Sequence, residues 1–179
     1  MRIRHGPAVI AFVVAAATIT LAQPALADET TTTFTIEPGS IGETSPASAD
    51  LGAADPGAPT TAQLGAVTVT DERAALSGSW TESVSSTAFT TGGGTGVETV
   101  PVANISYWSG PATATTGAGT FTPGQATSAA AQTFAASRTA FSWAGSGNNS
   151  ATFNPTLIVT VPATAVAGEY TGTVTHSVA

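Results

Sequence analysis

Apolar and polar residues alternate with a period of two along most of the chain, which indicates strands that are buried on one face. Trp80, Glu82 and Val84 fall on one face of such a strand, and Phe141 aligns with Trp143 in another. Threonine and serine fill many of the alternate positions, as expected for the exposed face of an antiparallel sheet. The alternation predicts strands over residues 63–70, 79–85, 102–108, 139–143, 156–161 and 170–178.

Glycine and proline interrupt this pattern at short intervals, so we expect turns between the strands. The predicted breaks lie at residues 92–94, 109–111, 123–124, 145–149 and 161–162. Two further stretches carry no strand pattern, because residues 38–59 are rich in Pro, Gly, Ala and Ser and residues 125–137 are rich in alanine. We expect residues 28–63 to be partly irregular, and the alanine-rich stretch has room for one helical turn.

Many short strands separated by turns predict an all-β domain, either a sandwich or a barrel. Tyr170 adds a more specific signal, because it enters the last strand directly after Ala167-Gly168-Glu169. In immunoglobulin-like sandwiches a tyrosine at such an entry donates a hydrogen bond back to the preceding loop. We therefore predict an immunoglobulin-like antiparallel β-sandwich, with an ordinary core position as the alternative role of Tyr170.

The first 27 residues have the features of a secretory signal peptide. Basic residues precede an apolar run, Ala8 to Leu21, which is shorter than the roughly 20 residues that a membrane-spanning helix needs. The small-x-small triplet Ala25-Leu26-Ala27 then matches the site that signal peptidase accepts. We expect cleavage after Ala27, secretion, and a mature chain of residues 28–179 that forms a single domain without a transmembrane segment.

The expected mature chain is strongly acidic. Loss of two of the four basic residues with the signal peptide leaves Arg73 and Arg138 against eleven acids, a formal charge of −9. We expect no nucleic-acid partner, since phosphate binding needs clustered Lys and Arg. Cysteine is absent, so neither disulfides nor thiolate metal sites are available in an oxidising compartment.

The mature sequence offers no recognisable catalytic or metal site, and we predict neither an enzyme nor a bound cofactor. His176 is its only histidine, and the G-x-S-x-G elbow of serine esterases is absent. His176 lies between Val174 and Val178 on an apolar strand face, which favours a core or rim position over catalysis. One histidine and scattered acids do not supply the ligands of a zinc site. Calcium binding by isolated acids stays open, but the D-x-[DN]-x-[DN]-G loop is absent.

Glu82 is the most unusual carboxylate, because it shares a strand face with Trp80 and Val84. It can lie at the rim of the sandwich, or it can be buried against Arg73 or Arg138. The rim is favoured, because burying an unpaired charge is costly.

Tyr107 and Trp108 are the candidate ligand contacts. Successive strand residues point to opposite faces, so one of the two aromatic rings should face outward. An exposed tryptophan can stack on a sugar ring, although a single exposed aromatic is more often neutral surface.

Several segments together resemble one known family. They are Leu64-Gly65-Ala66-Val67-Thr68-Val69-Thr70-Asp71, Gly78-Ser79-Trp80-Thr81, Phe89-Thr90-Thr91-Gly92, Asn154-Pro155-Thr156-Leu157 and Tyr170 to Val178. In this order the chain resembles secreted actinobacterial proteins related to the WxL domain, over essentially the whole mature sequence. The resemblance implies an all-β sandwich that associates non-covalently with the wall of Gram-positive bacteria, through peptidoglycan or another wall glycan.

The two W-x-L motifs of that family are altered in this chain. The first corresponds to Trp80-Thr81-Glu82 and keeps the tryptophan, whereas the second follows Tyr170 and corresponds to His176-Ser177-Val178. By this correspondence Trp80, Glu82, Tyr170, His176 and Val178 are expected in the core. We therefore expect a secreted surface module with a binding or structural role. A freely secreted carbohydrate-binding or adhesion domain is the alternative, and a hydrolase ranks third.

Overall fold

The computed structural model describes residues 28–179, and the predicted signal peptide lies outside the described residues. The chain divides into two units, Met1–Thr35 and Ile36–Ala179. Residues 28–35 carry no helix or strand, and every described strand belongs to the second unit. Its sheets are antiparallel, so the prediction of an all-β fold is confirmed. Within residues 28–179, no helix has the length and apolar character needed to span a membrane.

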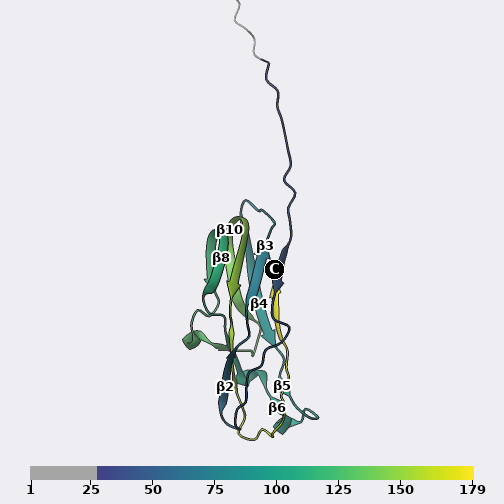
Figure 1. The fold of residues 1–179 in the computed structure, drawn as a ribbon, viewed down its shortest axis with the longest axis vertical. Coiled ribbons are helices and arrows are strands. Elements are labelled where there is room, and N and C mark those ends of the chain that lie inside the picture. The colour runs from purple at the N-terminus through teal and green to yellow at the C-terminus, as the bar shows by residue number, and fades with distance from the viewer. Residues whose placement is uncertain (1–27) are drawn as a thin grey trace, which may run out of the picture. The chain divides into compact units, whose positions relative to one another are not determined.

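The larger sheet is organised around one long strand, β10 (Arg138–Phe153). Strand β8 pairs with one side of β10, while β4 and β3 follow each other along its other side. Strand β1 pairs with the outer side of β3, and β12 pairs with the outer side of β4. Figure 1 shows β8 beside β10, with β3 and β4 on the other side of β10. The bounds of these strands are β1 Ile41–Thr44, β3 Val67–Asp71, β4 Gly78–Ser86, β8 Ala112–Pro123 and β12 Val174–Val178.

The second sheet has the order β2-β11-β7-β9, and a separate two-stranded hairpin is formed by β5 and β6. The bounds are β2 Pro59–Gln63, β5 Phe89–Thr90, β6 Thr99–Val100, β7 Ile105–Trp108, β9 Gln132–Thr133 and β11 Thr156–Thr160. Three short 3-10 turns complete the described elements: η1 Gly96–Glu98, η2 Val102–Asn104 and η3 Ser128–Ala130. The last of these is the helical turn for which the alanine-rich stretch had room.

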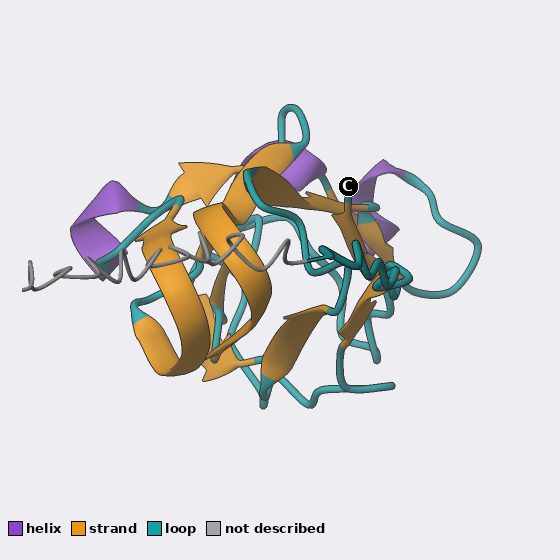
Figure 2. Ribbon diagram, turned by 90° about the horizontal axis from the view of Figure 1, so that it is seen from above, coloured by secondary structure: helices purple, strands orange, loops and turns teal. Residues whose placement is uncertain are grey.

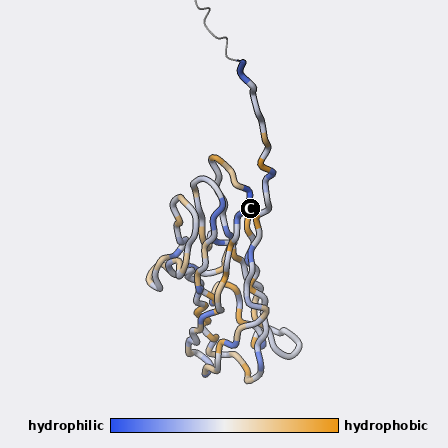
Figure 3. Tube along the Cα trace, turned by 45° about the horizontal axis from the view of Figure 1, so that its top comes forward, coloured by the Kyte–Doolittle hydropathy of each residue, from blue (hydrophilic) through white to orange (hydrophobic). Residues whose placement is uncertain are grey.

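Both sheets contribute to one hydrophobic core. On β4 the side chains of Trp80, Glu82 and Val84 lie on one face, as the alternation predicted, and all three are buried. From the second sheet, Ile105, Tyr107, Leu157 and Val159 belong to the same core. Figure 2, seen from above, shows strands around a common interior, and Figure 3 shows that most of the chain lies near the middle of the hydropathy scale. The core is therefore built from single inward-facing residues rather than from long apolar runs.

The predicted break at residues 145–149 is wrong, because β10 runs through it without interruption. Glycine is a weak strand former, but the stretches of β10 that flank this break are paired with β4 and β8 before it and with β3 and β8 after it. The pairing with β8 changes register between Ser146 and Ser150, so the glycines accompany a bulge. Gly119 on β8 approaches β10 so closely, at a φ of +136°, that a Cβ there would collide with the Trp143 ring.

The segment from Pro38 to Pro59 is mostly irregular, as predicted, apart from β1 and the first residue of β2. It leaves the larger sheet at the end of β1 and enters the second sheet at β2. The chain crosses again between β11 and β12, in the opposite direction. The last strand begins at Val174, later than the predicted residue 170, because Thr171 makes only an isolated bridge to Thr90.

Candidate functional site

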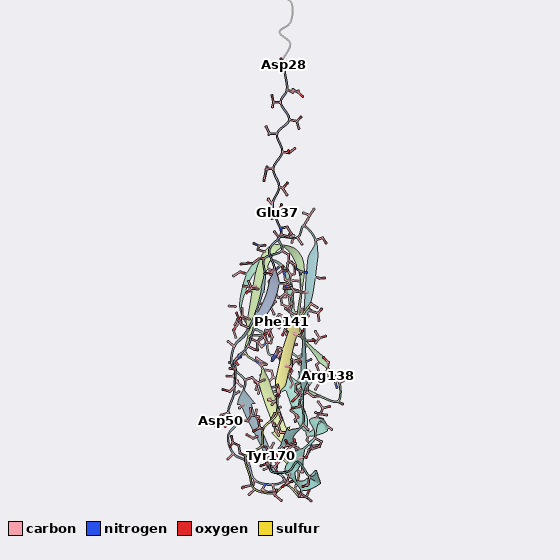
Figure 4. The ribbon with its side chains drawn as sticks, turned by 90° about the vertical axis from the view of Figure 1, so that its right-hand side faces the viewer. Asp28, Glu37, Asp50, Arg138, Phe141 and Tyr170 are labelled. Atoms are coloured by element: carbon pink, nitrogen blue, oxygen red, sulfur yellow. The ribbon has the colours of Figure 1, made fainter. Side chains whose placement is uncertain are left out.

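A cavity of about 1080 Å³ lies between the two sheets, and its lining includes both crossing segments. We call it the inter-sheet cavity. Residues 45–56 and residues 165–174 line it, and both segments are largely exposed to solvent. The volume is slightly above the range of about 300–1,000 Å³ that is common for ligand sites in proteins. Figure 4 places Asp50 and Tyr170, one from each segment, below the level of Phe141.

Core side chains contribute to the wall of this cavity. Val67 comes from the larger sheet, Leu157 and Val159 from the second sheet, and Phe89 and Val100 from the β5–β6 hairpin. The carboxylates of Asp50, Asp55 and Glu169 belong to lining residues in the two exposed segments. Neither arginine of the described chain lines the cavity. The site therefore combines apolar core residues with many polar groups from the two exposed segments, and the charged side chains in its lining are all acidic.

His176 provides a polar group inside the cavity. Its Nε2 atom lies 3.2 Å from the hydroxyl oxygen of Tyr107, so the contact joins β12 of one sheet to β7 of the other. The two rings also pack at a centroid distance of 5.9 Å. Burial lowers the pKa of His176 to about 4, so the imidazole is neutral at physiological pH. A neutral imidazole that shares one nitrogen with Tyr107 keeps its second nitrogen available as a donor or acceptor.

Glu82 is fully buried, which corrects the rim position expected from the sequence. Neither carboxyl oxygen has a hydrogen-bond partner, and the only ion pair in the described chain joins other residues, Arg73 and Asp71. Burial, reinforced by the charge of Glu43, raises the pKa of Glu82 to about 7. The structure thus accommodates Glu82 without a cationic partner by favouring its neutral form, and this avoids most of the cost of a buried charge.

Trp80 is fixed by a chain of polar contacts as well as by packing. Its Nε1–H donates to Oδ1 of the buried Asn149 at 2.8 Å. Asn149 in turn donates through Nδ2 to Asp71 Oδ2 at 3.3 Å. Trp80 and Trp143 are direct partners in the register of β4 and β10, and the Trp80 ring lies 6.4 Å from that of Phe141.

Asp71 completes this network with a bidentate salt bridge to Arg73. The guanidinium donates through Nε to Oδ1 and through Nη2 to Oδ2, each at 2.9 Å. The hydrogen bonds from Arg73 outweigh desolvation and lower the pKa of Asp71. Because Arg73 also donates to the carbonyl of Ser79, the network closes the loop between β3 and β4. The motif tryptophan therefore belongs to a structural network and is not part of the lining of the inter-sheet cavity.

Tyr170 and Val178 lie at the edge of the core. The Tyr170 hydroxyl donates to the carbonyl of Val166 at 2.9 Å and lies 3.2 Å from the carbonyl of Val97. This is the backward hydrogen bond that the sequence predicted for Tyr170, and it ties the segment 165–174 to the β5–β6 hairpin. Val178 is half-buried and packs against the core.

The two candidate ligand contacts have different surroundings. Tyr107 has an exposed fraction of 0%, so its ring offers no face to a ligand on the outer surface. Trp108 is half-buried on the other side of β7, and its indole N–H is enclosed without a hydrogen-bond partner. Neither residue lines the inter-sheet cavity, although Tyr107 reaches it indirectly through His176.

Sequence reasoning found His176 and Tyr170 but missed the cavity that they line. The available signal was the pair of stretches without periodicity, residues 38–59 and the segment before the last strand.

Among residues 28–179, no group of three or more His, Asp and Glu side chains is arranged to hold a metal ion. Comparisons with protein-family models, with curated proteins and with solved structures found no match.

Proposed function

We propose that this chain is an exported surface module that binds its ligand in the inter-sheet cavity. The observation that carries the proposal is the cavity itself, a partly open space of about 1080 Å³ lined by both polar and apolar residues from the two sheets and the two crossing segments. The signal-peptide features of residues 1–27 supply the proposed route out of the cell. The role is binding rather than catalysis, because the residues that meet in the cavity suit recognition of an apolar group.

The proposed fold is an immunoglobulin-like sandwich related to the WxL domain. Two antiparallel sheets with a shared core and the hydrogen bond from Tyr170 to Val166 support this proposal. The proposed location is the cell wall, with non-covalent attachment. Because the mature chain carries two basic residues against eleven acids, attraction to anionic wall polymers does not drive attachment, and short-range contacts in the cavity do.

Cell fractionation tests the proposed location. We expect the protein in the wall fraction of the producing organism, and we expect concentrated urea to release it without digestion of the wall. Immunoblots of wall, membrane and medium fractions give the distribution. Recovery solely from the medium would contradict wall attachment and favour the freely secreted alternative.

A further inference from the structure

Among residues 28–179, strand β12 has a hydrogen-bonded partner strand on one edge only. Strand β1 lies close to β12, and Val174 and His176 of β12 line the inter-sheet cavity. The backbones of Thr81 and Ala179 form a reciprocal hydrogen-bonded pair, with distances of 2.9 and 3.1 Å. In an antiparallel pair such bonds recur at every second residue, so Thr175 and Ser177 also face β4. The N–H and C=O groups of Val174, His176 and Val178 therefore point away from β4. Within residues 28–179, no backbone hydrogen bond to another segment occupies them.

The side chains of this edge and the cavity have a matching geometry. Val174 and His176 line the cavity, whereas Thr175 and Ser177 are exposed on the opposite face of β12. A strand added beside β12 would continue the larger sheet, so its alternate side chains would enter the space between the two sheets. The apolar lining residues that would receive them are the half-buried Leu51, Leu64 and Val161, because Val67 and Leu157 behind them are at most 1% exposed.

The charges around the cavity favour some peptides over others at the edge of β12. Asp50, Asp55 and Glu169 lie in the exposed segments that line the cavity, and no Lys or Arg lines it. In the described chain Arg73 is bound to Asp71, and Arg138 donates to the carbonyl of Thr133. An acidic peptide would meet repulsion without a counter-charge, whereas a basic peptide has three carboxylates within reach.

We propose that the inter-sheet cavity binds an extended peptide of a partner protein, and this inference rests on the proposed function. The peptide is apolar at alternate residues, carries positive charge, and adds to β12 as a further strand. Main-chain hydrogen bonds to β12 supply affinity, and the alternate side chains in the cavity supply selectivity.

A heptapeptide of alternating Val and Thr, flanked by Lys and labelled for fluorescence anisotropy, is the probe. We expect it to bind the folded domain, and we expect the same peptide flanked by Glu to bind at least about ten-fold more weakly at low salt. Two further versions carry N-methyl groups on alternate amides, in opposite registers. One should lose binding and the other should retain it, because only one edge of the added strand pairs with β12.

Variants of the domain supply matched controls. Val174→Pro and Val174→Ala both remove the valine side chain, but only proline removes the outward N–H, without breaking a bond to β4. We expect Val174→Pro to bind the Lys peptide about five-fold more weakly than Val174→Ala, the effect of one backbone hydrogen bond. Replacing Asp50, Asp55 and Glu169 together by their amides should weaken binding of the Lys peptide. Glu72→Gln, at an exposed position outside the cavity lining, should not.

Several results would overturn the inference. Equal binding of both N-methylated peptides would exclude strand addition, and equal binding of the Glu peptide would exclude selection by charge. A stable dimer of the domain that blocks the peptide would identify a second copy as the occupant. Protease-treated cell walls separate this inference from the proposed function. If the domain still binds protease-treated walls through its cavity, the peptide ligand is refuted but the proposed function is not. If the domain does not bind untreated walls, the proposed function is refuted.

Discussion

Replacing Trp80 by alanine is expected to lower the free energy of unfolding by about 3–5 kcal/mol, the range for large aromatic truncations in a core. Trp80 is 2% exposed, packs beside Phe141, and its indole N–H satisfies the buried Asn149. The substitution removes the ring and leaves Asn149 Oδ1 without its donor. Guanidinium unfolding followed by circular dichroism measures the change.

Two further variants separate packing from hydrogen bonding at this position. Trp80→Phe keeps most of the ring but removes the donor, and we expect a loss of about 1–3 kcal/mol. Asn149→Leu removes the acceptor, and the double variant should lose less than the sum of the single losses, because both changes break the same bond. An unchanged midpoint for Trp80→Ala together with lost wall binding would show that Trp80 contacts ligand instead.

Glu82→Gln is expected to stabilise the domain at pH 8 by about 3 kcal/mol and to have little effect near pH 4. The folded state holds the Glu82 proton up to a pKa of about 7, whereas the unfolded state releases it near the ordinary value of 4.5. Between these values the folded state binds more protons, so the unfolding free energy of the wild type falls by about 1.4 kcal/mol per pH unit. The loss is complete above pH 7. Glutamine cannot ionise, so the variant does not undergo this loss of unfolding free energy.

Urea unfolding of both proteins at a series of pH values tests this account. The difference between them is the informative quantity, because titrations of other groups, such as Asp71 and His176, enter both curves. The stability of the wild type falls between pH 4.5 and about pH 7. Glu43→Gln should lower the upper limit of this pH range, since the Glu43 charge contributes to the raised pKa of Glu82. A difference between wild type and Glu82→Gln that is the same at every pH would contradict the buried, protonated carboxyl.

Local alternation was a good guide to the strands because each strand is buried on one face. The common face of Trp80, Glu82 and Val84 and the opposite orientations of Tyr107 and Trp108 follow directly from the period of two. The backward hydrogen bond of Tyr170 was also predictable, since it depends on residues only four positions apart.

Features that depend on distant partners were not predictable in this way. Residues 145–149 contain two glycines and two asparagines, which predicts a turn, but β10 continues through them as a bulge between two stretches that pair with β8. Glu82 was expected at the rim because burial penalises a charge, yet protonation removes that charge. The inter-sheet cavity lies between two crossing segments, and no periodicity in residues 45–56 indicates where they fold.

Binding of the domain to purified cell walls, with the cavity open or filled, tests the central claim most directly. Val174→Trp places a large side chain in the cavity, and Thr175→Trp places the same side chain on the exposed face of β12. Val166→Trp, at a lining position that is 42% exposed, is a second filling variant with less effect on the core. With folding verified by circular dichroism, we predict that Val174→Trp and Val166→Trp lose retention and Thr175→Trp keeps it. Equal retention of all three folded variants would contradict the cavity as the binding site.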